Sequence, residues 1–335
     1  QTTSHELTWR IADALTVDGS EQIDRDLPQP RRTAGRVTID GAQMADIPEG
    51  TAAGRGQLVF LHTRDDGTVH MTRAPLDTTG TASFETHLFD RSYQVYLTRL
   101  QTVRHRPYRN LAAPLRRDWQ PAFGETVTFD ARPVEVSGTV TVNGEMMSHN
   151  SRGPNRDRGR LVFDTREADH DHIADLREGG FATLGGGGAA TFTKTLFASA
   201  TYDVYFDSRK RAEQDVLPGG GLVKVKENWS PTFGESLEVD LPHYEVSGSV
   251  QVNGETMPDN GGAGSASRGS IVFRNARLTG AFDNMRVELL AKDHVSAQLG
   301  DSGRAEYRVL LFGGTYDMRV AGRDSVEQDV LPGAA

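Results

Sequence analysis

Apolar and polar residues alternate along short stretches of the chain with a period of two. In residues 135–147, which read EVSGTVTVNGEMM, Val136, Val140 and Val142 alternate with serine and threonine. This alternation is typical of a β-strand with one buried face and one face in solvent. The dipeptide Asn143-Gly144 comes next, and Asn-Gly favours a two-residue hairpin turn in which both residues have positive φ. The pattern therefore predicts a strand that ends in a β-hairpin.

Further short apolar runs follow in the same part of the chain. We expect strands at residues 160–163, 191–197 and 202–206, with the last two forming a pair joined by a turn at residues 198–200. Strands around residues 223–225 and 237–239 come last. No amphipathic helix is evident, although the sequence allows one helical turn near residues 208–214. About seven short strands of this kind predict a β-sandwich.

The whole unit is repeated along the chain. Residues 245–257 read EVSGSVQVNGETM and match residues 135–147 at ten of thirteen positions, at an offset of 110 residues. A weaker first repeat begins at residue 34. A repeat of this length suits a complete domain and is too long for a solenoid unit. We therefore divide the chain into an N-terminal segment and three sandwich repeats, at residues 1–33, 34–133, 134–243 and 244–335.

The order of these motifs resembles the transthyretin-like β-sandwiches. VSGTVTVNGE, RLVF, ATFTKTLF and ATYDVYF follow one another in the second repeat, and LFGGTYDM in the third fits the family's G-x-Y-x-V element. The family includes the carboxypeptidase-regulatory-like and collagen-adhesin B-type repeats. The resemblance implies an all-β fold of three tandem antiparallel, Ig-like sandwiches that serve as a surface stalk, adhesin or fibre subunit. Some relatives carry a Lys–Asn isopeptide bond, which the lysine-free first repeat excludes there.

The two ends of the sequence complement each other. Residues 327–333 repeat residues 213–219 as EQDVLPG, after which the second repeat continues through residues 222–242 and the third does not. Residues 17–28 align without gaps on residues 231–242, at an offset of 214. We therefore expect the N-terminal segment to be the closing end of a sandwich, and the third sandwich to lack that end.

This relation predicts donor-strand assembly, in which the N-terminal segment adds strands to a sandwich of a neighbouring copy. A head-to-tail contact of this kind produces a filament unless the rotation closes a ring. The expected donor residues are Leu7, Trp9, Ile11, Leu15, Val17 and Ile23, and the expected acceptor residues are Val246, Val250, Phe273, Leu311, Tyr316 and Val330. Two alternatives stay open: the segment closes the third sandwich of its own chain, or the chain is a piece of a longer repeat protein cut out of phase.

Composition narrows the class of function. The net charge is −9 and the pI is about 5.6, whereas sequence-independent nucleic-acid binding needs a basic surface. The absence of cysteine excludes disulfides and thiol catalysis. No apolar run reaches the roughly 20 residues of a membrane-spanning helix. Because the sequence begins at Gln1, we expect a secreted protein whose signal peptide has been removed, although a cloned fragment or a chain without its first residues would begin in the same way.

Motifs for catalysis or cofactor binding are weak. The ten histidines share no repeat position, and the sequence contains no HExxH, GxSxG or GxGxxG motif. The densest group of metal-ligand types is Asp169, Asp171 and Asp175 beside two histidines. It lacks the glycine and the final glutamate of an EF-hand, so we interpret it as a solvated loop with weak metal binding as the alternative. Trp119 and Trp229 precede a repeated P-x-F-G-E motif, which favours core packing over carbohydrate stacking.

We therefore expect a non-enzymatic protein without a cofactor, the structural subunit of an extracellular filament whose partners are copies of itself. The alternative is a monomeric cell-surface adhesin or stalk that binds a glycan or a protein through its loops.

Overall fold

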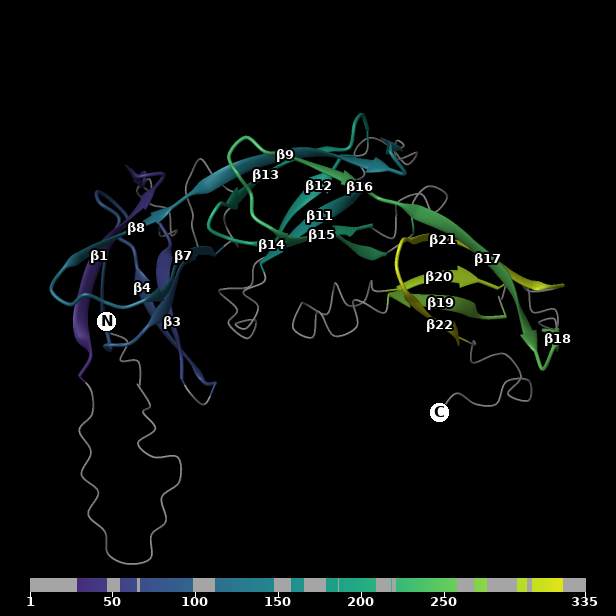
Figure 1. The fold of residues 1–335 in the computed structure, drawn as a ribbon, viewed down its shortest axis with the longest axis horizontal. Helices are drawn as coiled ribbons and strands as arrows, with labels where there is room; N and C mark the ends of the chain where they lie inside the picture. Colours follow the sequence, from purple (N-terminus) through teal and green to yellow (C-terminus); the bar gives the residue numbers. More distant parts are fainter. Residues whose placement is uncertain are drawn as a thin grey trace, which may run out of the picture.

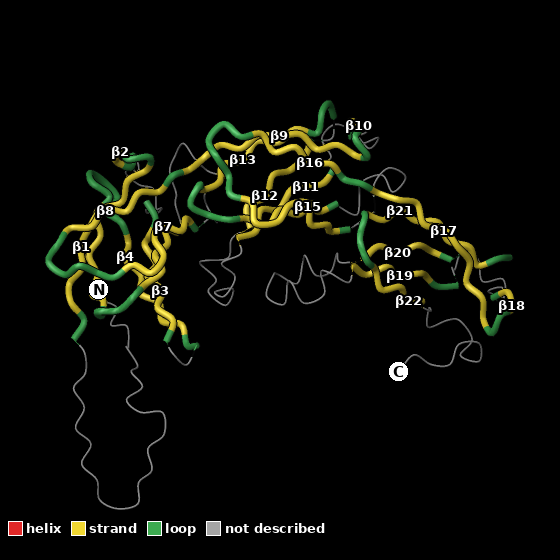
Figure 2. Tube along the Cα trace, viewed as in Figure 1, coloured by secondary structure: helices red, strands yellow, loops and turns green. Residues whose placement is uncertain are grey.

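The computed structural model shows three consecutive β-sheet bodies (Figures 1 and 2). Every regular element of the described residues is a β-strand, which confirms the all-β prediction. We name the bodies the first, second and third sandwich, for strands β1–β8, β9–β16 and β17–β22. The structure describes residues 29–46, 55–64, 67–98, 112–147, 158–165, 179–185, 187–208, 218, 221–257, 268–275, 294–299 and 303–321.

The first sandwich consists of two four-stranded sheets. In one sheet β1 is central, with β5 antiparallel on one side and β8 parallel on the other, and the short β2 extends β1 through a hairpin. The other sheet has the antiparallel order β4-β3-β6-β7. The strands are β1 (Arg31–Ile39), β2 (Ala42–Gln43), β3 (Gln57–Thr63), β4 (Val69–Pro75), β5 (Ser83–Leu88), β6 (Tyr93–Thr98), β7 (Ala113–Trp119) and β8 (Thr126–Ala131).

The second sandwich repeats this topology. Its sheets are β10-β9-β13, with β16 parallel to β9, and β12-β11-β14-β15. The sequence pattern predicts antiparallel sheets, and it misses the one parallel pair in each of the first two sandwiches. The strands are β9 (Pro133–Val142), β10 (Glu145–Met146), β11 (Gly159–Thr165), β12 (Gly179–Leu184), β13 (Thr191–Phe197), β14 (Tyr202–Asp207), β15 (Leu222–Trp229) and β16 (Ser236–Asp240).

The third sandwich has three strands in each sheet within the described residues. The orders are β18-β17-β21 and β20-β19-β22. Strands that would correspond to β15 and β16 of the second sandwich are not among the described residues. The strands are β17 (His243–Val252), β18 (Glu255–Thr256), β19 (Ser270–Asn275), β20 (His294–Gln298), β21 (Ala305–Phe312) and β22 (Tyr316–Ala321).

The predicted hairpin turns are confirmed. Asn143 and Gly144 have φ of 51° and 80° and join β9 to β10, where Val142 lies opposite Glu145. Asp40-Gly41 and Asn253-Gly254 have the same positive φ values, between 52° and 84°. A two-residue turn with both φ positive is the type that matches the twist of its strands.

The prediction that residues 191–197 pair with residues 202–206 is wrong. β13 pairs with β9, whereas β14 pairs with β11 and β15 in the opposite sheet. The chain therefore crosses between the two sheets at residues 198–201, and Tyr202 holds this crossing, because its hydroxyl accepts a hydrogen bond of 3.1 Å from the Phe197 backbone N–H. Tyr93 accepts the same bond from Phe89 at 3.0 Å. The sequence pattern also misses β12, whose glycines hide the alternation.

Three arginines that precede central strands are almost completely buried. Arg158 donates hydrogen bonds to the carbonyls of Met147 and Gly188, at 2.8 and 3.1 Å, and so joins the loop after the hairpin to the loop before β13. Arg268 bonds to Met257 and Gly303 in the same way in the third sandwich.

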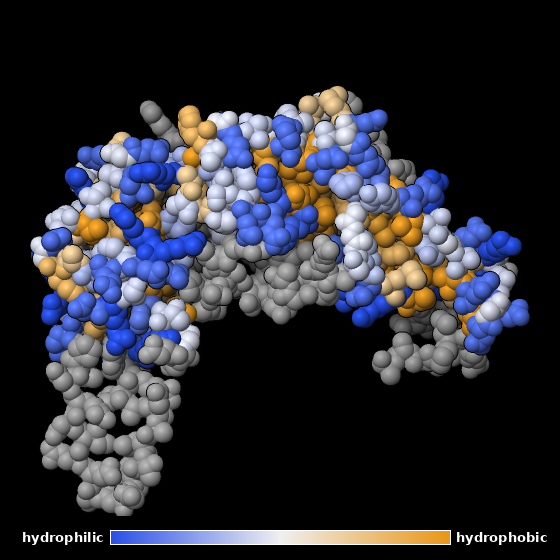
Figure 3. Space-filling view, in the orientation of Figure 1, coloured by the Kyte–Doolittle hydropathy of each residue, from blue (hydrophilic) through white to orange (hydrophobic). Residues whose placement is uncertain are grey.

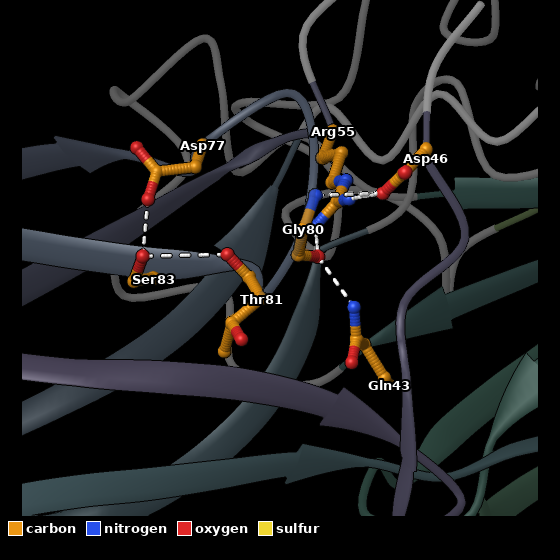
Figure 4. Close-up of polar contacts among 7 residues, drawn as sticks. All are labelled: Gln43, Asp46, Arg55, Asp77, Gly80, Thr81 and Ser83. Atoms are coloured by element: carbon orange, nitrogen blue, oxygen red, sulfur yellow. Dashed lines mark hydrogen bonds and ion pairs between the residues drawn. The ribbon is translucent and has the colours of Figure 1, made fainter.

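In the first sandwich this position is Arg55 (Figure 4). Its guanidinium donates to the Gly80 carbonyl at 2.7 Å and pairs with Asp46, which also accepts from the Gly80 N–H. The glycine that follows each arginine has φ between 122° and 136°, a conformation that only glycine adopts readily. These Arg-Gly pairs therefore tie together the loops at one end of each sandwich.

Short linkers join the sandwiches. Only Arg132 separates β8 from β9, and only Leu241 and Pro242 separate β16 from β17. Phe312 is buried and its ring lies 5.8 Å from that of Phe206, centroid to centroid, across the joint between the second and third sandwiches. The Asn143 side chain accepts a hydrogen bond of 3.1 Å from the His243 backbone N–H. These contacts fix the two sandwiches against each other.

The turn geometry gives a stability prediction. We expect Gly144→Ala to lower the free energy of unfolding of the second sandwich by about 1–2 kcal/mol, because an L-residue is strained at positive φ. Urea unfolding of a chain in which Trp229 is the sole tryptophan measures this effect. The control is Gly185→Ala, at an open position without positive φ, which should leave the midpoint unchanged. Equal midpoints for both variants would contradict the prediction.

Candidate interaction surface

One side of the third sandwich exposes residues that face a core in the other two sandwiches. Met318 on β22 is 59% exposed, whereas Val204 at the same position of β14 is 0% exposed. Val320 is 47% exposed, and its counterpart Phe206 is 0% exposed. In the second sandwich β15 and β16 cover these positions. Within the described residues the third sandwich is therefore open along β17 and β22, and we call this its open side.

The β17 edge shows the same opening. Val246 and Val250 are partly exposed, whereas Val136 and Val140 at the matching positions of β9 are fully buried. β22 has one edge without a strand partner among the described residues, and β17 lacks there the parallel partner that β1 and β9 have. An edge strand presents unpaired N–H and C=O groups and is a template for pairing with another strand.

Gly248 takes the position at which a glycine of the other two sandwiches allows close approach of a parallel strand. A Cβ atom at Gly138 would lie 2.0 Å from the carbonyl oxygen of Leu237 on β16, so glycine is required there for close approach of the two backbones. Gly35 meets the Val127 carbonyl on β8 in the same way, at 2.3 Å. At Gly248 the three atoms nearest to such a Cβ all belong to the Tyr307 side chain, and none belongs to the backbone of a parallel strand.

Five of the six predicted acceptor residues lie in one cluster. Phe273 and Leu311 are buried in the small core of the third sandwich, and Val246, Val250 and Tyr316 pack against it. Burial raises the pKa of Tyr316 to about 12, and its hydroxyl donates to the Phe312 carbonyl at 3.0 Å. The surface over this sandwich shows hydrophobic side chains in orange (Figure 3). Val330 lies outside the described residues.

The second sandwich shows how the closing strand β15 is held. The Asp203 carboxylate on β14 accepts a hydrogen bond of 3.0 Å from the Asn228 backbone N–H and pairs with Lys224 at 2.8 Å. Asp203 is 4% exposed. Its counterpart on β22 is Asp317, which is exposed.

The parallel strand is held by a carboxylate that binds the hairpin turn. Asp240, at the end of β16, accepts hydrogen bonds of 2.8 Å from the Gly144 N–H and from the Thr141 hydroxyl. The bond from Gly144 outweighs partial burial and holds the pKa of Asp240 below its usual value. Asp130 binds Gly41 and Thr38 likewise; burial disfavours its charged form, but these bonds and Arg132 lower its pKa overall.

Other predicted residues fall into two groups. Trp229 is buried, with its indole N–H donating to Glu235 at 2.9 Å, and Trp119 packs 5.2 Å from the Phe129 ring, so both tryptophans are core residues. The remaining predicted residues lie outside the described residues: the donor residues Leu7, Trp9, Ile11, Leu15, Val17 and Ile23, and the metal candidates Asp169, Asp171 and Asp175.

Within the described residues, no group of three or more His, Asp or Glu side chains is placed to hold a metal ion. The same part of the chain contains no helix long and apolar enough to cross a membrane.

The residues that hold the closing strands belong to no motif that predicts this role. Aspartate is common in this chain, and no local motif distinguishes Asp203, Asp130 or Asp240 from the others. Only the repeat could have indicated two of them, because Asp130 and Asp240 end the matching segments VTFD and LEVD. The buried arginines also had a signal, in the Arg-Gly pair before each L-V-F or I-V-F triplet.

No protein-family model matches the chain, and no curated protein matches it significantly. Solved structures give weak similarities. The TIE protein of Bacillus anthracis aligns at 10% identity and a TM-score of 0.20, over 88% of this chain and 45% of that protein. The chain therefore spans less than half of that protein's length.

Two further structures align over nearly their whole length. A DUF3823 family protein from Parabacteroides merdae has 13% identity and a TM-score of 0.21, over 55% of this chain and 92% of that one. The shaft pilin SpaA from Lactobacillus rhamnosus GG, as a double mutant, has 7% identity and a TM-score of 0.20, over 64% and 97%. At these TM-scores the similarity supports no statement about function.

The pKa of Asp240 gives a pH prediction. Because this pKa is lowered by folding, its contribution to stability is complete above the usual value of 3.8 and is lost as the pH falls through the lowered value. We expect Asp240→Asn to lower the melting temperature at pH 7, and we expect the difference from the unchanged chain to shrink below pH 4. Thermal unfolding across this range measures it. The exposed Glu255→Gln is the control, and a constant difference for Asp240→Asn across the range would refute the assignment.

Proposed function

We propose that the chain is the structural subunit of an extracellular filament, and that residues 7–27 of one copy complete the third sandwich of the next copy. The observation that carries this proposal is the open side. Met318 and Val320 are exposed there, whereas the same positions of the two complete sandwiches are buried beneath closing strands. Addition of strands to exposed sheet edges is an established mode of protein recognition.

The N-terminal sequence has the residues that such strands need. At the offset of 214, Trp9 and Ile11 take the positions of Val223 and Val225, which pack against the core from β15. Ile23 takes the position of the buried Leu237 on β16. The apolar side chains would cover the positions that β22 and β17 leave exposed.

One donor position that would face the core has a different residue type from its counterparts, and the acceptor residue that it would contact also differs. Arg25 takes the position of the buried Val239, which is Phe129 in the first sandwich. Phe129 stacks on Phe84, with centroids 5.9 Å apart. In the third sandwich the residue that corresponds to Phe84 is Tyr307, whose ring and hydroxyl suit a guanidinium better than an aliphatic core does.

The sequence after the proposed donor strands supports a joint between two copies that resembles the joint between the second and third sandwiches of one copy. In the second sandwich the closing strand β16 leads through Asp240-Leu241-Pro242 into β17. Asp26-Leu27-Pro28 repeats this sequence three residues before β1 begins at Arg31. The donated segment would thus continue into the first sandwich of its own copy, in the same way that β16 continues into β17 of the third sandwich.

The arrangement of the sandwiches favours a neighbouring copy as the acceptor. β1 and β22 lie toward opposite ends of the long axis (Figure 1). Only Gln29 and Pro30 separate Pro28, which follows the proposed donor residues 7–27, from β1. A strand attached at the first sandwich is therefore far from the third sandwich of its own chain.

A second candidate function is a surface adhesin or stalk that binds a ligand through its loops. It is favoured by Phe233, which is 91% exposed at the turn between β15 and β16. Hydrogen bonds from Thr232 and Trp229 to Glu235 fix this turn. A rigid, exposed aromatic ring is a suitable contact residue.

Two complementary variants of the full chain test the filament. Trp9→Asp places a charge on the donor face, so this acceptor-only copy should bind a strand but not give one. Val320→Glu places a charge on the open side, so this donor-only copy should give a strand but not accept one. We expect the unchanged chain to form filaments, each variant alone to remain monomeric, and an equimolar mixture to form heterodimers that sediment at twice the monomer mass.

Ser20→Asp is the control, because Ser20 takes the position of Gly234, an exposed residue of the turn between β15 and β16, and this variant should assemble as the unchanged chain does. Monomers of the unchanged chain at high micromolar concentration would overturn the filament. Filaments formed by either charged variant alone would overturn the donor-strand joint.

A further inference from the structure

The closing strand β15 is held at its outer face by one carboxylate. Asp203 Oδ1 accepts from the Asn228 backbone N–H at 3.0 Å, and Asp203 Oδ2 lies 2.8 Å from Lys224 Nζ. The backbone hydrogen bond fixes the register of β15 along β14. The ion pair also requires a cationic side chain four residues before Asn228. A carboxylate that is both buried and hydrogen-bonded is a strong contact, because leaving it without these partners is costly.

The three sandwiches differ at this position. In the first sandwich, Gln94 takes the position of Asp203, and Pro114 takes the position of Lys224 on the neighbouring strand. The charged pair is therefore absent there. In the third sandwich the carboxylate returns as Asp317, which lies exposed on β22.

The N-terminal segment supplies the matching cation. At the offset of 214, Arg10 takes the position of Lys224 and Ala14 takes the position of Asn228, whose contribution is a backbone N–H. Arginine thus occurs in the one segment that we propose to meet Asp317.

We infer that Asp317 is the residue that selects and registers the donated strand, through an ion pair with Arg10 of the neighbouring copy and a hydrogen bond from its Ala14 N–H. This inference rests on the proposed filament. It also gives a reason why the third sandwich would take the N-terminal segment rather than a β7 strand released from another copy, since that strand carries Pro114 at the paired position.

The residue beyond Asp317 on the same face adds a second constraint. Arg319 takes the position of Tyr205, which lies opposite Lys224 in the ladder. Arg10 would therefore lie directly opposite Arg319, a like-charge pair that is unfavourable by itself. Asp317, two residues from Arg319 on the same face, is the carboxylate that would offset this repulsion, so its replacement by a cation is especially unfavourable.

The donor-only and acceptor-only copies measure a single joint and so allow a double-mutant cycle on full chains. Asp317→Lys is made in the acceptor-only copy and Arg10→Glu in the donor-only copy. We expect each change alone to raise the Kd of the heterodimer by about tenfold or more, as for close charge pairs at other interfaces, and the two together to recover most of the loss. Isothermal titration or sedimentation gives the Kd.

Glu306→Lys in the acceptor-only copy is the matched control, because Glu306 is an exposed carboxylate on β21, away from the open edge. It should leave the Kd unchanged. Asp317 is exposed, so Asp317→Lys should keep the fold, which circular dichroism and the melting temperature verify.

The outcomes separate the two proposals. If the two copies fail to bind without further changes, the filament itself is wrong. If they bind and Asp317→Lys changes the Kd less than twofold, or if the double change recovers nothing, the role of Asp317 and Arg10 is wrong while the filament stands.

Discussion

Parallel pairing between the first and last strands of a sandwich is the constraint on which the rest of this architecture depends. β8 lies beside β1, and β16 lies beside β9, with one glycine of the first strand under a carbonyl of the last. Because the pair is parallel, the last strand ends at the far end of the sandwich, where the hairpin turn lies. The next sandwich must therefore begin there, and the chain proceeds in one direction along the row.

This geometry couples closure of one sandwich to placement of the next. Asp240 binds the hairpin turn of the second sandwich at Gly144, and two residues later the chain is already in β17. The same turn contacts the start of β17 through Asn143 and His243. The strand that completes a core is thus also the strand that sets the joint. Among the described residues the third sandwich has neither part, so its open side combines exposed core positions with a strand edge that lacks a partner.

Much of the fold could be predicted from sequence, because it is local and repeated. Period-two alternation and an Asn-Gly turn located β9 and its hairpin, and the internal repeat located the matching β17 and the weaker β1 and indicated successive sandwiches. Sheet assignment could not be predicted in the same way. Neighbouring strands such as β13 and β14 have the alternation of a hairpin, and it is their pairing with β9 and β11 in the structure that shows that the chain crosses between sheets. β12 was missed because glycine carries no hydropathy signal.

The open side was indicated by the sequence only through comparison of the repeats. Alternation alone makes Met318 and Val320 core residues, since β22 has the pattern of β14. Their exposure depends on strands distant in sequence, and no local pattern reports it. The polar contacts were harder still, because Asp203 and Asp240 act on backbone N–H groups that every residue carries.

An edge that exposes apolar side chains and free backbone groups is a risk for a soluble protein, and natural sheets usually protect such edges with charge, proline or distortion. β22 bears charges on its outer face, Asp317 and Arg319, while its inner face is apolar. Charges on the outer face disfavour nonspecific pairing between edge strands, whereas the apolar row on the inner face stabilises binding of a strand with apolar residues at the matching positions. In the proposed filament, the two faces of one strand would separate the two requirements of assembly: the inner face would supply burial, and the outer face would decide which strand binds. Selection by a few outer charges would also leave the core free to keep the aromatic and aliphatic packing that the first two sandwiches share.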